Sequence, residues 1–240
     1  MSKTADKALF CYHLISLLLT VYFLWWGMFA APKFEIDYLF HLTFLTQELL
    51  CFYYIWTLLQ DYRNVFYPSP EKSQRYQDGT YTLLQILLPM TCLVTAGYWP
   101  MRLRDESLML TEDGKGFPII LSLFNHGLNI LFTSFETFLF EQKICKSFLW
   151  KFSVIMTGTM VYVSMQAIFQ NVTGRPVYPF LAALAISEIA VFYAILCVFT
   201  LMAERVNTFL IFNIHKKAQH SSIMTSKRSK MAAFLKSKCE

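Results

Sequence analysis

Six apolar stretches of about 20 residues divide this chain, and they constrain its fold more than any other feature of the sequence. They cover residues 8–30, 38–59, 81–101, 117–140, 148–169 and 178–202. Each has the length that an α-helix needs to cross a hydrocarbon core about 30 Å thick. Backbone polar groups in lipid must bond within their own segment, so such stretches predict helices. The 240 residues therefore predict an all-α fold, a polytopic membrane bundle of six transmembrane helices.

The positions of Lys and Arg predict the orientation of this bundle. Six spans place both termini on one side, together with 16 of the 21 basic residues. The positive-inside rule then predicts that both termini are cytosolic. Residues 1–204 form the predicted transmembrane domain, and residues 205–240 form a basic cytosolic tail that is partly helical or disordered. Its start, residues 205–217, either continues the last helix or lies in the membrane interface. A basic tail beside a membrane indicates topology and attraction to anionic lipid, so no nucleic-acid partner is expected.

Two short signals concern the compartment and its modifications. Lys236 and Lys238 stand fifth and third from the end of the sequence, like the dilysine signal that a retrieval receptor reads. This pattern predicts the endoplasmic reticulum membrane, with the plasma membrane as the alternative. Asn171 begins an Asn-Val-Thr sequon in an expected lumenal loop, so close to the fifth stretch that we favour an unoccupied site. The sequence does not determine the oligomeric state.

Polar side chains line one face of the fourth stretch. Ser122, His126, Asn129, Thr133 and Glu136 follow one another at spacings of 4, 3, 4 and 3 residues, which is one face of a helix. In lipid such a face must meet protein or a wet cavity, because each unpaired polar group costs several kcal/mol. Hydrogen bonds between helices explain Asn129 and Thr133 adequately. An ionisable histidine at this depth is a candidate functional residue.

Thr43, in the second stretch, is a candidate partner for His126. Both stretches enter the membrane from the same predicted side, and the two residues differ in depth by only about 6 Å. A threonine hydroxyl is a weak nucleophile until a base removes its proton, and imidazole does this near neutral pH. Taken alone, Thr43 is better explained as a helix threonine bonded to the carbonyl one turn earlier. The pair is therefore a hypothesis that needs further support.

Two motifs supply that support through a family resemblance. Tyr38 followed by Leu42-Thr43-Phe44, and Asn125-His126-Gly127, resemble in order, spacing and membrane context the androgen-induced protein family. That family is known for intramembrane threonine hydrolases that cleave fatty acid esters of hydroxy fatty acids. The resemblance implies Thr43 as nucleophile, His126 as general base, a lipid ester substrate within the bilayer, and no cofactor. It assigns no role to Asn125, which could donate to an oxyanion or orient a helix, and we favour the second role. Where other members carry a later histidine and a later proline, this chain has Asn129 and Ser134, so its substrate preference can differ.

The remaining acidic residues within the apolar stretches are Glu48, Glu136 and Glu188. Glu136 follows His126 by ten residues, about 15 Å along a helix, which excludes direct contact. Glu48 and Glu188 remain candidates for orienting His126.

Two other classes of protein fit the same residues. One is a non-catalytic lipid-binding or regulatory membrane protein in which Thr43 and His126 only pack. The other is a small transporter or proton path lined by the polar face of the fourth stretch together with Glu48 and Glu188. No cluster of Cys and His has the spacing of zinc ligands, so the sequence predicts no metal.

Overall fold

All regular secondary structure among the described residues is helical, and none of these residues forms a strand. The computed structural model describes residues 3–30, 41–67, 70–104, 118–139, 147–178, 181, 185–206, 208–210 and 212–213. Its elements are α1 (Lys3–Ala30), α2 (Leu42–Phe66), α3 (Pro70–Arg104), α4 (Ile119–Leu123), the π-helical turn η3 (Phe124–Leu128), α5 (Asn129–Leu139), α6 (Phe148–Thr173) and a C-terminal helix, Ile186–Leu210. The predicted all-α class is confirmed.

Five of these helices are long and apolar enough to cross a membrane. They are Lys7–Phe29, Leu42–Phe66, Gly79–Arg104, Leu149–Thr173 and Ile186–Leu210. The predicted fourth span is not among them because η3 divides it, so that α4, η3 and α5 follow one another without a gap. The number of spans and the side on which the termini lie therefore remain predictions.

Several helices extend beyond the apolar stretches that predicted them. α2 continues to Phe66, past the predicted end at residue 59, and α3 begins at Pro70, before the predicted start at residue 81. The C-terminal helix runs to Leu210 and so crosses the predicted boundary between residues 204 and 205. It therefore continues into the start of the tail, whereas Lys236 and Lys238 lie outside the described residues. The reason is that helical hydrogen bonding continues through polar residues after the apolar run has ended.

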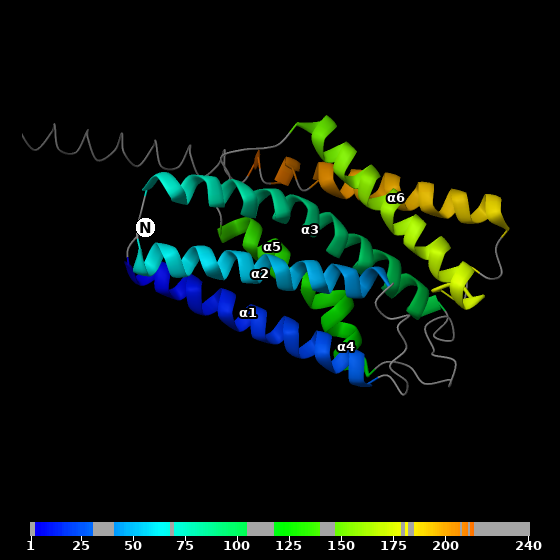
Figure 1. Cartoon of the computed structure of the whole chain (residues 1–240), viewed down its shortest axis with the longest axis horizontal. Helices are drawn as coiled ribbons and strands as arrows, with labels where there is room; N and C mark the ends of the chain where they lie inside the picture. Colours follow the sequence, from blue (N-terminus) through cyan, green and yellow to red (C-terminus); the bar gives the residue numbers. More distant parts are fainter. Residues whose placement is uncertain are drawn as a thin grey trace, which may run out of the picture.

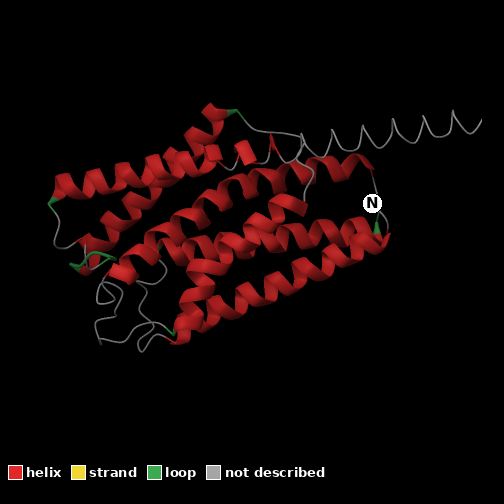
Figure 2. Cartoon of the chain, turned by 180° about the vertical axis from the view of Figure 1, so that it is seen from behind, coloured by secondary structure: helices red, strands yellow, loops and turns green. Residues whose placement is uncertain are grey.

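α2 lies at the centre of the bundle and packs against α1 and α3. The divided segment fills the remaining side, with contacts to all three helices, while α6 and the C-terminal helix lie together beyond α3 (Figures 1 and 2). The buried core joins α2 to α3 through Leu50, Tyr53, Tyr54, Leu84 and Leu87.

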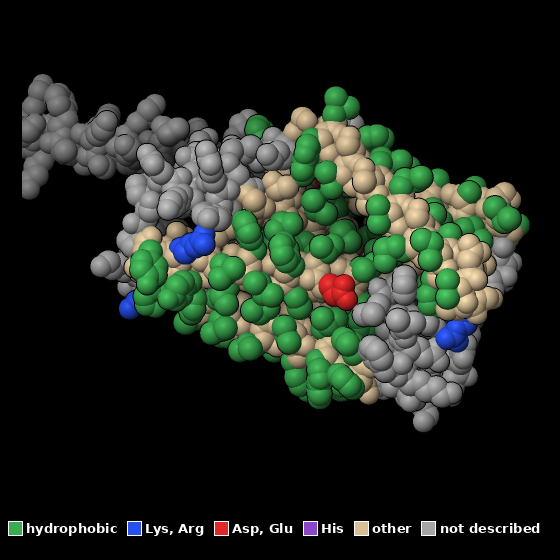
Figure 3. All heavy atoms as spheres, viewed as in Figure 1, with side chains coloured by type: hydrophobic (Ala, Val, Ile, Leu, Met, Phe, Trp, Pro, Cys, Tyr) green, Lys and Arg blue, Asp and Glu red, His purple; other side chains and the backbone are tan. Residues whose placement is uncertain are grey.

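The outer surface is apolar along the helices. Large hydrophobic side chains are exposed on several of them, for example Leu18 on α1, Met160 on α6 and Ile186 on the C-terminal helix. In Figure 3 hydrophobic side chains cover the middle of the visible face, and basic side chains lie toward its two ends. A water-soluble monomer rarely exposes so much contiguous apolar surface, whereas lipid covers it at no cost. The chain is a multi-pass membrane protein.

Candidate active site

The structure brings Thr43 and His126 together. Thr43 lies in the first turn of α2, and His126 lies in η3, where it is 9% exposed. The distance from Thr43 Oγ1 to His126 Nε2 is 3.1 Å, which is a hydrogen bond. Residues from two helices, 83 positions apart in the sequence, thus form one polar pair inside the bundle.

The second ring nitrogen of His126 determines the direction of this bond. Nδ1 lies 3.1 Å from the main-chain oxygen of Ser122. A carbonyl oxygen can only accept, so Nδ1 carries the proton. In the neutral ring Nε2 is then an acceptor, and the Thr43 hydroxyl donates to it. A hydroxyl donating to an oriented imidazole is the arrangement of a nucleophile and its general base.

Two aromatic residues of α3 hold the His126 ring and its main chain. The Tyr98 ring stacks on the imidazole, with 3.5 Å between ring centroids and 10° between planes. Trp99 Nε1 donates to the His126 carbonyl at 2.9 Å, and the Tyr98 hydroxyl donates to Ser122 Oγ at 2.9 Å. Arg102 in turn donates to the Tyr98 hydroxyl. Sequence analysis did not single out these residues, because aromatic side chains near a span end are ordinary in membrane proteins.

The π turn explains why so many side chains bond to main chain here. Besides Ser122 and His126, Asn125 offers its carbonyl to a side chain, the Asn129 amide nitrogen at 3.0 Å. A π turn displaces carbonyl groups from the regular helical pattern, and buried carbonyls need partners. Here His126, Trp99 and Asn129 supply those partners. π turns within α-helices occur frequently at functional sites.

The start of α2 is anchored by residues from the C-terminal part of the chain. The Leu42 amide donates to the Tyr178 hydroxyl at 3.0 Å, and that hydroxyl lies 3.0 Å from the hydroxyl of Tyr162. The His41 ring, just before α2, meets the Tyr178 ring edge-on, with centroids 4.9 Å apart. These contacts position the turn that carries Thr43, and no pattern in the sequence indicated them.

The other polar residues of the fourth segment bond between helices. Gln47 Nε2 of α2 donates to Asn125 Oδ1 at 3.0 Å, which supports the orienting role that we favoured for Asn125. Thr133 of α5 lies 2.9 Å from the hydroxyl of Thr91 of α3, oxygen to oxygen. Asn129 and Thr133 are buried, at 2% and 0% exposed, so the predicted polar face does meet protein.

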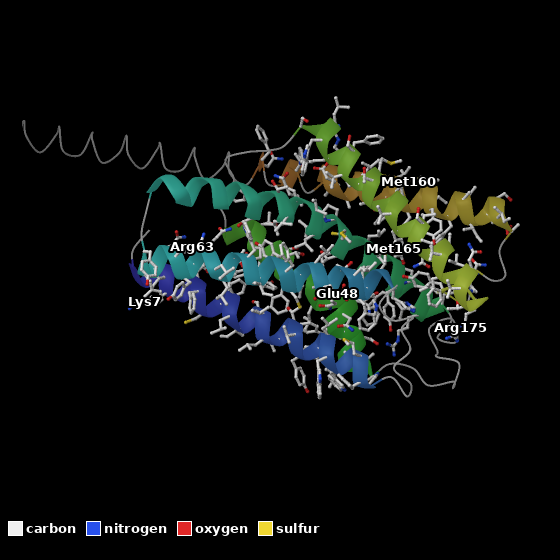
Figure 4. The ribbon with its side chains drawn as sticks, in the orientation of Figure 1. Lys7, Glu48, Arg63, Met160, Met165 and Arg175 are labelled. Atoms are coloured by element: carbon white, nitrogen blue, oxygen red, sulfur yellow. The ribbon has the colours of Figure 1, made fainter. Side chains whose placement is uncertain are left out.

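The structure does not bring Glu48 or Glu188 to His126. Glu48 lies exposed on the outside of α2, where Figure 4 labels it and where Figure 3 shows an acidic patch among hydrophobic side chains. It follows Thr43 by five residues, and five residues turn a helix by about 140°. Glu188 is exposed, and its carboxylate accepts from the Ala185 amide at 2.8 Å, a helix-capping bond. The Ser122 carbonyl, which cannot be recognised in a sequence, has the orienting position instead.

The described part of the chain offers no cluster of ligands for a metal ion. No group of three or more His, Cys, Asp or Glu side chains there could hold a metal ion.

The fold and this site together define a class, a multi-pass helical membrane protein with a threonine–histidine pair inside its bundle. The chain belongs to the FAR-17a/AIG1-like protein family, whose model matches residues 12–210. The match runs from α1 to the end of the C-terminal helix and confirms the family predicted from the two motifs. No curated protein and no solved structure matches the chain.

Proposed function

We propose that the protein is an intramembrane lipid esterase that hydrolyses fatty acid esters of hydroxy fatty acids. Thr43 is the nucleophile and His126 is the general base. The observation that carries the proposal is the 3.1 Å contact between Thr43 Oγ1 and His126 Nε2, with His126 Nδ1 held by a carbonyl. Membership of the FAR-17a/AIG1-like family supports it independently of this geometry.

The proposed reaction has two halves. Thr43 Oγ1 attacks the ester carbonyl carbon while His126 Nε2 takes the hydroxyl proton. The bond to the leaving alkoxide then breaks, the alkoxide receives that proton, and the acyl group remains on Thr43. Water attacks the acyl-threonine with His126 again as base, which releases the fatty acid and restores the threonine hydroxyl. Both oxygen nucleophiles are activated by the same nitrogen.

In each half of the reaction the attacked carbonyl oxygen becomes negatively charged, and the first turn of α2 is placed to stabilise this oxyanion. The amide of Thr43 belongs to this turn, where the helix itself offers no acceptor. The positive end of the helix dipole favours negative charge at the same place. The Leu42 amide donates to the Tyr178 hydroxyl, and the Leu45 amide donates to the His41 carbonyl. We therefore assign the Thr43 amide as an oxyanion donor.

The apolar surroundings suit a substrate with long acyl chains. Burying each methylene of such a chain contributes about 0.8 kcal/mol, so a lipid ester gains most of its binding energy from the chain. A site within the bilayer also receives a water-insoluble ester without its transfer through water. This chain has Asn129 and Ser134 where other members differ, and hydrolysis of esters of graded acyl length measures its preference.

We further propose six spans with both termini cytosolic, the divided segment α4–η3–α5 being the fourth, in the endoplasmic reticulum membrane. The distribution of basic residues supports this orientation. The Thr43–His126 pair then lies toward the lumenal side of the bundle. Asn171 is exposed in the last turn of α6, on that same side, so glycosylation of an Asn171 sequon would report the orientation.

Labelling with a fluorophosphonate tests the nucleophile. The purified wild type should be labelled, and Thr43→Ala and His126→Ala should lose both labelling and hydrolysis of the ester at unchanged expression. Thr46→Ala is the matched control, because its hydroxyl bonds to the Leu42 carbonyl one turn earlier and not to a base. Full labelling of Thr43→Ala would remove Thr43 from the nucleophile role. Labelling of no form of the protein, with no ester hydrolysis, would favour the non-catalytic lipid-binding class.

The transporter alternative receives no support from the two acids that suggested it. It requires Glu48 and Glu188 to line an interior path. One lies on the exposed face of α2 and the other caps a helix.

A further inference from the structure

A second cluster of ionisable side chains lies buried at the opposite end of the bundle from Thr43 and His126. It joins His13 of α1, Asp61 of α2 and Glu136 of α5, which are 0%, 7% and 0% exposed. His13 lies near the start of α1 and Asp61 near the end of α2, at the end of the molecule where Figure 1 marks the N-terminus. The esterase mechanism uses none of these residues.

The contacts of His13 define its charge. Nδ1 lies 2.5 Å from Asp61 Oδ2, and Nε2 lies 3.2 Å from Glu136 Oε2. A hydrogen bond needs a proton between its two atoms, and Glu136 Oε2 also accepts from the Tyr53 hydroxyl at 2.9 Å. An oxygen that accepts from Tyr53 is the acceptor toward Nε2 as well. A carboxylic acid is a stronger acid than an imidazolium, so the proton between Nδ1 and Asp61 belongs to His13. His13 therefore donates through both nitrogens and is an imidazolium.

The remaining oxygen of Glu136 shows where one more proton belongs. With both carboxylates ionised, the cluster would carry one net negative charge in an apolar interior. No Lys or Arg of the described residues forms an ion pair with Asp61 or Glu136 to balance it. Glu136 Oε1 is buried and has no hydrogen-bond partner, which is costly for an ionised oxygen. A proton on Oε1 removes both costs at once.

Acceptors for that proton stand beside it. The hydroxyls of Tyr12 and Tyr54 neighbour each other, Ser16 and Glu136. Both are buried, and neither makes a hydrogen bond of regular geometry. A hydroxyl oxygen accepts as readily as it donates. A tyrosine hydroxyl could also donate to an ionised Oε1, but only a proton on Oε1 provides the bond and removes the net negative charge as well.

We propose that Glu136 binds an exchangeable proton at Oε1, so that the cluster is a neutral intramembrane proton-binding site. It then consists of a His13–Asp61 ion pair and a carboxylic acid. The unequal distances agree, because a charge-assisted bond, here to Asp61, is shorter than a bond to a neutral acceptor. Losing the proton would leave a net negative charge where three helices meet. The bound proton therefore stabilises the packing of α1 against α2 and α5.

The titratable groups that face Glu136 come from α1 and α2. α1 contributes Tyr12 and His13, and α2 contributes Tyr53, Tyr54 and Asp61. α3 bonds to α5 through the neutral pair Thr91 and Thr133.

Infrared difference spectroscopy of the whole protein tests this site without any substrate. At neutral pH the wild type should show the carbonyl band of a protonated carboxylic acid, which shifts in deuterated water because the proton exchanges. Glu136→Gln should lose this band and keep its melting temperature, since an amide mimics the neutral acid. If the spectrum of Glu136→Gln lacks only bands of an ionised carboxylate, the proposal is wrong.

Two further variants keep the test decisive. Glu188→Gln is the matched control, because its carboxylate caps a helix at the surface, and the band should remain. Tyr53→Phe keeps Glu136 but removes a donor to Oε2. Its acid carbonyl band should move to higher frequency, which tests the assignment if Glu136→Gln fails to fold. An unmoved band in Tyr53→Phe would contradict the assignment to Glu136.

Discussion

His126 is held by several groups that differ greatly in what they contribute. The Ser122 carbonyl sets which nitrogen carries the proton, and the Tyr98 ring fixes the plane of the imidazole at a centroid distance of 3.5 Å. The Tyr98 hydroxyl acts one step further away, through Ser122 Oγ. These contacts order the expected effects of mutation: loss of the ring should matter more than loss of the hydroxyl.

Tyr98 therefore offers a graded test at the scale of one residue. Tyr98→Phe keeps the stacked ring and loses two hydrogen bonds, one to Ser122 and one from Arg102. Only the bond to Ser122 leads to His126, and at about 1 kcal/mol its loss should lower the rate of fluorophosphonate labelling by about fivefold at most. Tyr98→Leu also loses the ring and should fall further, toward the level of His126→Ala. Labelling rates and melting temperatures of both variants measure this. Equal rates for Tyr98→Leu and the wild type would show that the stacked ring does not position His126.

Sequence reasoning reached only some of these residues, for physical reasons. Thr43 and His126 could be paired because helix rise converts sequence position into membrane depth. The Ser122 carbonyl could not be predicted, since every residue has one and its use depends on the π turn. His13 could have been found, because the argument that singled out His126 applies to any histidine inside a span. Its partner Asp61 lies in the part of α2 beyond the predicted apolar stretch.

At the scale of elements, the divided fourth segment separates two kinds of interior. η3 turns His126 toward α2 and α3 near one end, while the regular helix α5 carries Glu136 toward α1 and α2 near the other. An uninterrupted α-helix was the natural expectation from spacings of 4, 3, 4 and 3 residues. Such spacings do not reveal one turn of π-helix, because periodicity defines a face only approximately. The packing of neighbouring helices decides where that turn forms.

Substitutions at two glycines test how closely α1 must approach α2. A Cβ at Gly27 of α1 would lie 3.1 Å from Phe44 Cε1, a buried ring next to Thr43. Gly27→Ala should therefore destabilise the fold by about 1–3 kcal/mol and slow labelling, because overpacking displaces Phe44. At Gly127 the nearest atom, Leu123 Cδ1, would lie at an ordinary 3.4 Å.

Gly127→Ala is thus the matched control within the Asn-His-Gly motif. Its melting temperature should stay the same or rise slightly, because alanine suits a helix better than glycine by up to about 1 kcal/mol. Thermal unfolding in detergent and labelling rates compare the two variants. A larger loss of stability in Gly127→Ala than in Gly27→Ala would contradict the close contact between Gly27 and Phe44.

At the scale of the whole molecule, α6 and the C-terminal helix are fastened to each other near one end by a buried ion pair. Lys151 of α6 donates to Glu204 of the C-terminal helix and to Thr208 one turn later. Both charged side chains are buried, at 5% and 3% exposed. Toward the other end, Tyr162 and Tyr178 connect this helix pair to the start of α2. The pair of outer helices thus supports the turn that carries Thr43.

Replacing only one member of the Lys151–Glu204 pair should therefore lower the stability of the fold. Lys151→Met leaves a buried carboxylate without its cation, and Glu204→Met leaves a buried ammonium, each at a cost of about 3–5 kcal/mol. The double variant removes both charges and replaces them with apolar volume, so its stability should return close to that of the wild type. Melting temperatures in detergent, with exposed Lys7→Met as the control, measure the cycle. If both single variants have the melting temperature of the wild type, the ion pair does not stabilise the packing of these two helices. If the double variant is as unstable as the sum of the single variants, Lys151 and Glu204 act independently and the outer helices are held by their apolar contacts alone.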